Sequence, residues 1–219
     1  MSKEKSTTEP SSLKEWGIWL LQTLVLAAIL FGIITLLNHF VLDNARVSGT
    51  SMQPTFEDGD RLIAFRHSKL HQGDVVVVDA PDEPGQFYIK RIIATPGQSV
   101  VAKNNQIYIN GKKLKQNYLK PGLKLVDDGS DGVYGTRYAD TGDFTLRSLA
   151  KTSNYMQIYS KDQLNQLKKT NRVPKNSYFV MGDHRSVSKD SRYIGFIKRN
   201  KVVGVVKWRY WPLNHMKTF

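Results

Sequence analysis

A serine-bearing stretch, SGTSMQPT at residues 48–55, combines several hydroxyl groups with a glycine and a proline, which are typical turn residues. A turn alone could account for this composition. A reactive serine could account for it too, but a serine hydroxyl is a weak nucleophile until a base accepts its proton. If this stretch does chemistry, the rest of the chain must supply that base.

Few residue types in the chain can serve as the base. There is no cysteine and there are five histidines, while arginine stays protonated in proteins. Lysine differs, because burial disfavours the charged ammonium and lowers its pKa by as much as about 3–5 units. A lysine that is neutral near neutral pH is a competent general base.

One lysine, Lys90, lies in the stretch YIKRIIATPG, residues 88–97. If this stretch is a strand, side-chain alternation places Lys90 on the same face as Tyr88 and Ile92. Arg91 also lies among apolar residues, on the other face, so alternation alone does not say which cation is buried. Each could instead extend its charged head to water past an apolar stem. Apolar surroundings for Lys90 are what a Ser-Lys dyad requires.

A third polar stretch, MGDHRSVSKDSRYIGFI at residues 181–197, follows the short apolar run YFVM. One interpretation is a surface loop, where ion pairs contribute only about 0–1 kcal/mol. The other is a set of residues that orients the dyad. The stretch packs serines among charged residues: Ser186, Ser188 and Ser191 among Asp183, Arg185, Asp190 and Arg192.

The elements that must position these residues begin with a long apolar segment, residues 16–42, which contains no Asp, Glu, Lys or Arg. About 20 predominantly apolar residues suffice to cross a bilayer. The segment is too long for the apolar region of a signal peptide, and no clear cleavage site follows it. It is apolar on all sides, unlike most core helices, and carries Trp16 and Trp19 near one end. We predict a transmembrane helix at 15–42, after a disordered tail at 1–14.

Charge gives this helix an orientation. Three lysines precede it, whereas Arg46 and Arg61 are the only basic residues among the twenty that follow it. This bias predicts a cytoplasmic amino terminus and an extracytoplasmic domain. The net charge of +13 belongs to that domain, since three lysines offset three glutamates before the helix. We expect attraction to anionic membrane lipids and no nucleic-acid partner, because no nucleic-acid motif accompanies the charge.

After residue 43 the pattern changes to short runs of period two, bounded by Gly, Pro, Asn and Asp. Asn110-Gly111 between two such runs predicts a hairpin. The run of four valines at 75–78 predicts a strand buried on both faces. The candidate strands are 45–48, 61–65, 74–80, 87–95, 99–102, 106–109, 112–114, 178–181 and 202–210.

The stretch 116–172 is polar and has no long apolar run, so we expect a smaller inserted cap there. One helix is predicted within it, at 161–169, with Ser160 and Gln163 at capping spacing and Leu164 and Leu167 on one face. No other clear helix is expected after residue 43. The fold class is mostly β, with a catalytic domain formed by 43–115 and 173–219.

We predict no metal and no cofactor. His67 and His71 have i,i+4 spacing, but no acidic partner completes a zinc-binding pattern, and thiolate sites are excluded by the lack of cysteine.

Together, the serine, lysine and GDHRSVSKDSR stretches, in this order behind one apolar helix, resemble the motifs of bacterial type I signal peptidases. The resemblance extends from residue 16 to residue 197, with the insert between the lysine and the last motif. A single span, a basic domain and modest length are similar to the Gram-positive members.

The resemblance implies that Ser51 is the nucleophile and Lys90 the general base of an acyl-enzyme mechanism. The Ser51 backbone N–H would contribute to the oxyanion hole. Some relatives have a second donor, a hydroxyl side chain two positions before the serine. Here that position is Gly49, as in the Gram-positive pattern.

The resemblance also implies that Ser188 hydrogen-bonds Lys90, and that Asp190 and Arg192 form an ion pair that braces the loop. One departure is that the last motif usually has GDNR, whereas this chain has GDHR. His184 can still donate and accept hydrogen bonds, and it could add a pH dependence.

The expected function is that of a membrane-anchored serine endopeptidase that removes signal peptides from secretory precursors. Its substrates would carry small residues, typically A-x-A, before the cleaved bond, and would pair as an extended strand near Ser51. One rival is a self-cleaving repressor-type Ser-Lys protease, but a membrane helix stands where its DNA-binding segment would be. The other is an inactive relative that acts as a membrane-anchored scaffold or wall-binding module.

Overall fold

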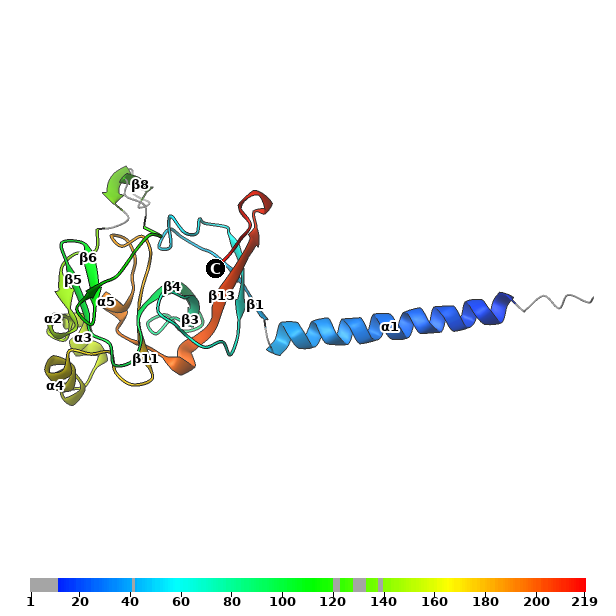
Figure 1. Cartoon of the computed structure of the whole chain (residues 1–219), viewed down its shortest axis with the longest axis horizontal. Coiled ribbons are helices and arrows are strands. Elements are labelled where there is room, and N and C mark those ends of the chain that lie inside the picture. Colours follow the sequence, from blue (N-terminus) through cyan, green and yellow to red (C-terminus); the bar gives the residue numbers. More distant parts are fainter. Residues whose placement is uncertain (1–11, 41, 120–122, 128–132, 138–139) are drawn as a thin grey trace, which may run out of the picture. The chain divides into compact units, whose positions relative to one another are not determined.

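The computed structural model describes residues 12–40, 42–119, 123–127, 133–137 and 140–219, and divides into two compact units, residues 1–42 and 43–219 (Figure 1). The first unit contains one helix, α1 (Ser12–Phe40). Its stretch Glu15–Thr35 is long and apolar enough to cross a membrane. The helix begins three residues before the predicted start and ends two before the predicted end. The predicted tail falls mainly on residues 1–11, which lie outside the described residues.

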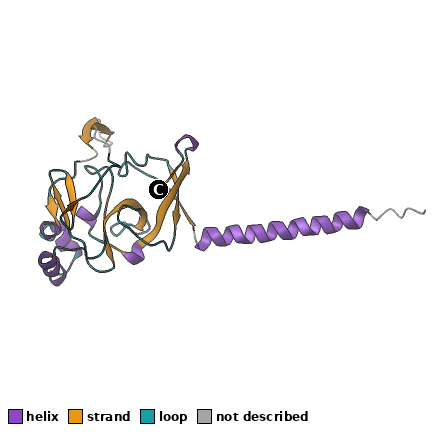
Figure 2. Cartoon of the chain, viewed as in Figure 1, coloured by secondary structure: helices purple, strands orange, loops and turns teal. Residues whose placement is uncertain are grey.

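The second unit is mostly β, as predicted (Figure 2). Its larger, eight-stranded sheet has the order β1-β2-β13-β3-β4-β11-β12, with β14 paired to β13. The strands are β1 (Leu42–Arg46), β2 (Arg61–Phe65), β3 (Val75–Asp79), β4 (Phe87–Ala94), β11 (Ser177–Met181), β12 (Ile197–Lys198), β13 (Val202–Trp211) and β14 (Lys217–Thr218).

The valine run accounts for the centre of this sheet. Val75 and Val77 pack in one hydrophobic cluster, and Val76 and Val78 pack in another. Strand β3 is thus buried on both faces, as predicted. It pairs antiparallel with β4, so that Val76 lies opposite Lys90. The buried strand therefore fixes the position of the lysine.

A four-stranded sheet has the order β10-β5-β6-β7. The hairpin between β6 and β7 turns at Asn110 and Gly111, whose φ angles of 50° and 78° are the positive values that a type I′ turn needs. This predicted hairpin is confirmed. The strands are β5 (Val100–Lys103), β6 (Gln106–Ile109), β7 (Lys112–Lys113) and β10 (Phe144–Thr145), and a separate pair is formed by β8 (Leu123–Asp127) and β9 (Val133–Arg137).

The predicted helix is α4 (Lys161–Thr170), with the expected capping box between Ser160 and Gln163 and with Leu164 and Leu167 buried. The expectation of no other helix after residue 43 is wrong. Further helices of four to six residues are present: α2 (Leu146–Leu149), α3 (Ser153–Ile158) and α5 (Ser191–Ile194), besides the 3-10 turns η1 (Arg199–Lys201) and η2 (Leu213–His215). They are too short to show a helical period, and side-chain caps from Thr145, Thr152 and Asp190 begin them.

The described part of 116–172 packs closely on the strands around it. Strand β10 pairs with β5, and Leu146 and Tyr155 share a hydrophobic cluster with Ile93 and Phe179. Helices α2, α3 and α4 lie beside β5 and β6 at one side of the unit (Figure 1). The inserted cap at 116–172 stays a prediction.

Candidate active site

The serine stretch forms a compact turn held by buried anchors. The Gly49 N–H donates to Asp58 Oδ1 at 2.8 Å, and the Phe56 N–H donates to the Met52 carbonyl at 3.0 Å. Met52 and Phe56 are buried in the hydrophobic cluster that also contains Val75 and Val77. Met52 and Phe56, which follow Ser51 in the turn, thus hold the serine against the core.

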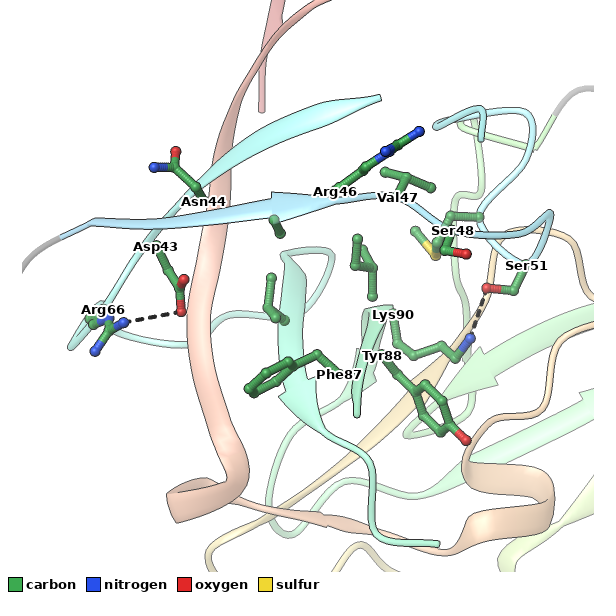
Figure 3. A pocket seen from close by; sticks show the side chains of 14 residues that line it. Asp43, Asn44, Arg46, Val47, Ser48, Ser51, Arg66, Phe87, Tyr88 and Lys90 are labelled. Atoms are coloured by element: carbon green, nitrogen blue, oxygen red, sulfur yellow. Dashed lines mark hydrogen bonds and ion pairs between the residues drawn. The ribbon is translucent and has the colours of Figure 1, made fainter. Parts of the chain in front are cut away.

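Lys90 is brought directly to this serine. It lies on β4 with only 3% of its surface exposed, and its Nζ donates to Ser51 Oγ at 2.9 Å (Figure 3). Arg91, its neighbour, is buried as well. Both faces of this strand are therefore covered, which explains why alternation alone did not distinguish the two cations.

Burial lowers the pKa of Lys90 from its usual 10.5 to about 8. The carboxylates of Asp190, Asp183 and Asp82 act in the opposite direction, and the guanidinium of Arg192 lowers the pKa further. A substantial fraction of this lysine is thus neutral at pH 8, which is the form that can accept a proton.

The loop 182–192 closes the site from the other side. Its His184 N–H donates to the Ser51 carbonyl at 3.0 Å. Asp190 pairs with Arg192 through two contacts of 2.9 Å and accepts the Gly182 N–H at 3.0 Å. The expected ion pair is therefore present, and it fixes the backbone of a loop that touches the serine.

A cavity of about 350 Å³ opens beside the pair (Figure 3). One wall is the segment from Asp43 to Ser48, and the other is β4 from Phe87 to Lys90. Apolar side chains such as Val47, Met52 and Ile89 line it, and an extended peptide could lie between the walls. Among the described residues, no group of three His, Asp or Glu side chains could hold a metal ion.

Comparison with known proteins shows which family the chain belongs to. The profile of the family described as "Signal peptidase, peptidase S26" matches residues 18–211. The chain belongs to this family. Its activity class, a peptidase that removes signal peptides, agrees with the sequence prediction, and the scaffold alternative is not favoured.

Individual relatives cover nearly the whole chain. Signal peptidase IB of Staphylococcus aureus is 35% identical over 202 residues, which are 90% of this chain and 93% of that protein. Signal peptidase I of Streptococcus pneumoniae is 33% identical over 210 residues, 94% and 97% of the two chains. A crystal structure of a signal peptidase I from Enterococcus faecalis V583 is 32% identical, covers 63% of this chain and 97% of that one, and has a TM-score of 0.43.

The expected hydrogen bond between Ser188 and Lys90 is not formed. Ser188 Oγ is buried and has no hydrogen-bond partner within the described part of the chain. It lies behind Gly182, where a Cβ built on the glycine would come within 2.2 Å of it. The loop places this hydroxyl against its own backbone, so Lys90 is held by Ser51 and by burial.

Sequence reasoning missed a buried ion pair that joins all three motifs. Arg91 donates to Asp183 through Nε at 2.9 Å and Nη2 at 2.6 Å. Asp183 also accepts the Thr55 hydroxyl at 2.5 Å, and Thr55 lies four residues after the nucleophile candidate Ser51. The available signal was the apolar neighbours of Arg91, since a cation that is buried needs a charged partner, and Asp183 is one of the acidic residues of the last motif.

Gly182→Ala is expected to reduce precursor cleavage by about 10²-fold, since a misplacement of about 1 Å at the reacting atoms has this effect. The added Cβ would lie 2.4 Å from the Ser51 carbonyl oxygen and must displace that backbone. Gly204→Ala is the matched control: its Cβ would meet the Phe65 carbonyl at 3.0 Å, away from Ser51. Steady-state cleavage of a precursor measures both, and an equal loss in the two variants would contradict the argument.

Proposed function

We propose that this family member is a membrane-anchored signal peptidase I whose nucleophile is Ser51 and whose general base is Lys90. The observation that carries the proposal is the 2.9 Å separation of Lys90 Nζ and Ser51 Oγ in a buried environment. A neutral amine at this distance can accept the hydroxyl proton directly.

In the first half of the reaction, Ser51 Oγ attacks the carbonyl carbon of the scissile peptide as its proton passes to Lys90. The ammonium then donates this proton to the leaving amine, the peptide bond breaks, and an ester remains on Ser51. In the second half, Lys90 takes a proton from a water that attacks the ester. The same proton returns to Ser51 Oγ as the signal peptide leaves, so protons balance over the cycle.

The oxyanion that forms in each half needs donors. The Ser51 N–H makes no hydrogen bond to any described residue and is available for this role. Gly49, two residues earlier, has no side chain to add a second donor. The proposed oxyanion hole thus depends on backbone N–H groups. Ser188, Asp190 and Arg192 would support the dyad through the loop they belong to.

The substrates proposed are secretory precursors with small residues, typically A-x-A, before the cleaved bond. The cavity between the segment 43–48 and β4 suits an extended chain. Asn44 and Arg46 lie at its rim (Figure 3).

Membrane lipids are the second proposed partner. Helix α1 supplies the span, and the charge bias on its two sides favours a cytoplasmic amino terminus. The catalytic unit carries exposed aromatic and apolar side chains near its carboxyl end, namely Trp208, Trp211, Leu213 and Met216. Tryptophans of this kind suit the lipid headgroup region, and the basic charge suits anionic lipids.

The decisive experiment is cleavage of a precursor that carries an A-x-A site by the full chain in lipid. We expect Ser51→Ala to lose activity by at least about 10³-fold, while Ser48→Ala, which changes a hydroxyl at the cavity wall, keeps most of it. An inert wild type that is folded would favour the scaffold alternative. Unchanged cleavage by Ser51→Ala would overturn the assignment of the nucleophile.

A further inference from the structure

Lys90 is almost completely shielded from water although two exposed segments flank it. One is the tip of the β3–β4 hairpin, where residues 81–86 are all exposed. The other is the loop 182–192, where the Lys189 side chain is 57% exposed. Exposed segments are usually mobile on their own, so specific contacts must keep them closed over the amine.

Those contacts run from one segment to the other. Lys189 Nζ forms an ion pair with Asp82 Oδ2 and lies 3.5 Å from Glu83 Oε1, although more than a hundred residues separate them in sequence. The Tyr88 hydroxyl donates to the same Asp82 oxygen at 3.4 Å. The Tyr88 ring centroid lies 5.3 Å from Lys90 Nζ.

The other end of this chain of contacts is anchored in buried structure. Lys189 stands between Ser188 and Asp190, which are both buried. Behind Ser188 lies Gly182, which in turn touches the Ser51 carbonyl. Contacts therefore surround the dyad from Lys90 through Tyr88, Asp82 and Lys189 back to the nucleophile candidate.

We propose that Asp82 and Lys189 are positioning residues that close the hairpin tip onto the loop 182–192, hold the Tyr88 ring over Lys90 and keep bulk water from reaching its amine on that side. We name Asp82, Lys189 and Tyr88 the amine shield. The inference rests on the proposed role of Lys90 as the base. It adds a function for three residues that make no hydrogen bond to the dyad.

The charges around Lys90 give the variant Lys189→Ala a single expected direction for the pKa shift of Lys90. The strand β4 itself carries Arg91, and the loop 182–192 presents Asp183, Asp190 and Arg192, while Asp82 faces it from the hairpin tip. Lys189→Ala opens the shield, and hydration of the amine raises its pKa. The change also removes a cation and leaves Asp82 unpaired, which raises the pKa in the same direction.

The test is the pH dependence of kcat/KM for precursor cleavage by the full chain in lipid. For Lys189→Ala we expect the acidic limb to move to higher pH by about one unit, with activity recovering at high pH. The matched control is Lys201→Ala, which removes an exposed ion pair of 3.3 Å between Lys201 and Asp79, a residue of the same hairpin. We expect it to leave the limb in place.

Charge reversal gives an independent check on the contact itself. The pair Asp82→Lys with Lys189→Asp rebuilds the ion pair in the opposite sense and should bring the limb back toward that of the wild type. Lys189→Asp alone gathers three carboxylates and should move the limb further than Lys189→Ala. An unmoved limb in Lys189→Ala, or an equal shift in Lys201→Ala, would overturn the inference.

An NMR titration of isotope-labelled Lys90, assigned by its absence from Lys90→Ala, reports the same pKa without any activity. If the wild type cleaves nothing, the proposed function fails, yet a raised Lys90 pKa in Lys189→Ala would still support the shield. If the wild type cleaves and neither the limb nor the titration moves, the shield alone is wrong.

Discussion

Lys90→Met is expected to abolish precursor cleavage and at the same time to stabilise the folded protein. Methionine has nearly the length of lysine and suits apolar surroundings, but it cannot accept the Ser51 proton. Without a base, activity should fall by at least about 10³-fold at every pH. In the wild type, kcat/KM should fall about tenfold for each pH unit below about 8, because the proposed base is the neutral amine of Lys90.

The gain in stability follows from the direction of the pKa shift. Burial lowers the pKa of Lys90 from 10.5 to about 8, so the unfolded chain binds the proton more tightly than the native one. The resulting penalty is fully present below pH 8 and is relieved as the pH rises from about 8 to 10.5. It amounts to about 3 kcal/mol at most. Losing the hydrogen bond to Ser51 offsets about 1 kcal/mol, which leaves a net gain of about 2 kcal/mol.

Denaturant unfolding at pH 7 and at pH 10.5, together with a cleavage assay, checks both effects. The stability gain of Lys90→Met should shrink at the higher pH, where the wild-type amine is neutral in the folded state and about half neutral in the unfolded state. Lys175→Met, at an exposed position, controls for the change of residue type and should alter neither measurement. Cleavage that survives in Lys90→Met would require a different base. A loss of stability at pH 7 would contradict the proposed cost of burying the Lys90 amine.

The sequence was sufficient where one physical requirement left a single solution. A run of four valines has no polar face, so Val75–Val78 had to be a strand buried on both sides. A two-residue hairpin turn needs positive φ angles at both central residues, and Asn110-Gly111 adopts them readily. The need of a serine nucleophile for a base pointed to a buried lysine, the resemblance to type I signal peptidases singled out Ser51 and Lys90, and the structure brings these two side chains together.

Where two solutions had similar free energies, sequence was not sufficient. Lys90 and Arg91 had equally apolar neighbours, and both are buried because each has a different partner, Ser51 and Asp183. The motif does not fix where the Ser188 hydroxyl points, and in the structure it lies against Gly182 of its own loop. The helices α2, α3 and α5 depend on caps and on tertiary packing. They are too short for a hydrophobic period in the sequence to reveal them.

Asp183 supplies the largest expected loss of stability. Its carboxylate is completely buried and accepts two hydrogen bonds from Arg91 and one from Thr55. In Asp183→Ala the Arg91 guanidinium still donates to the Gly73 carbonyl at 2.8 Å and still lies over the Tyr118 ring. It then has no counter-charge at hydrogen-bond distance. A buried charge that loses its partner typically costs about 3–5 kcal/mol. Cleavage should fall as well, because Thr55 then loses the contact that ties the serine turn to the loop 182–192.

Two further variants separate the unpaired charge from the lost packing. Asp79→Ala removes the exposed ion pair with Lys201 and should cost no more than about 1 kcal/mol. The double variant Arg91→Met with Asp183→Leu removes both charges and should recover most of the stability lost in Asp183→Ala. Recovery of stability without recovery of cleavage would show that the pair serves the geometry of the dyad. A double variant as unstable as the single one would mean that the buried site needs these polar groups for the fold itself.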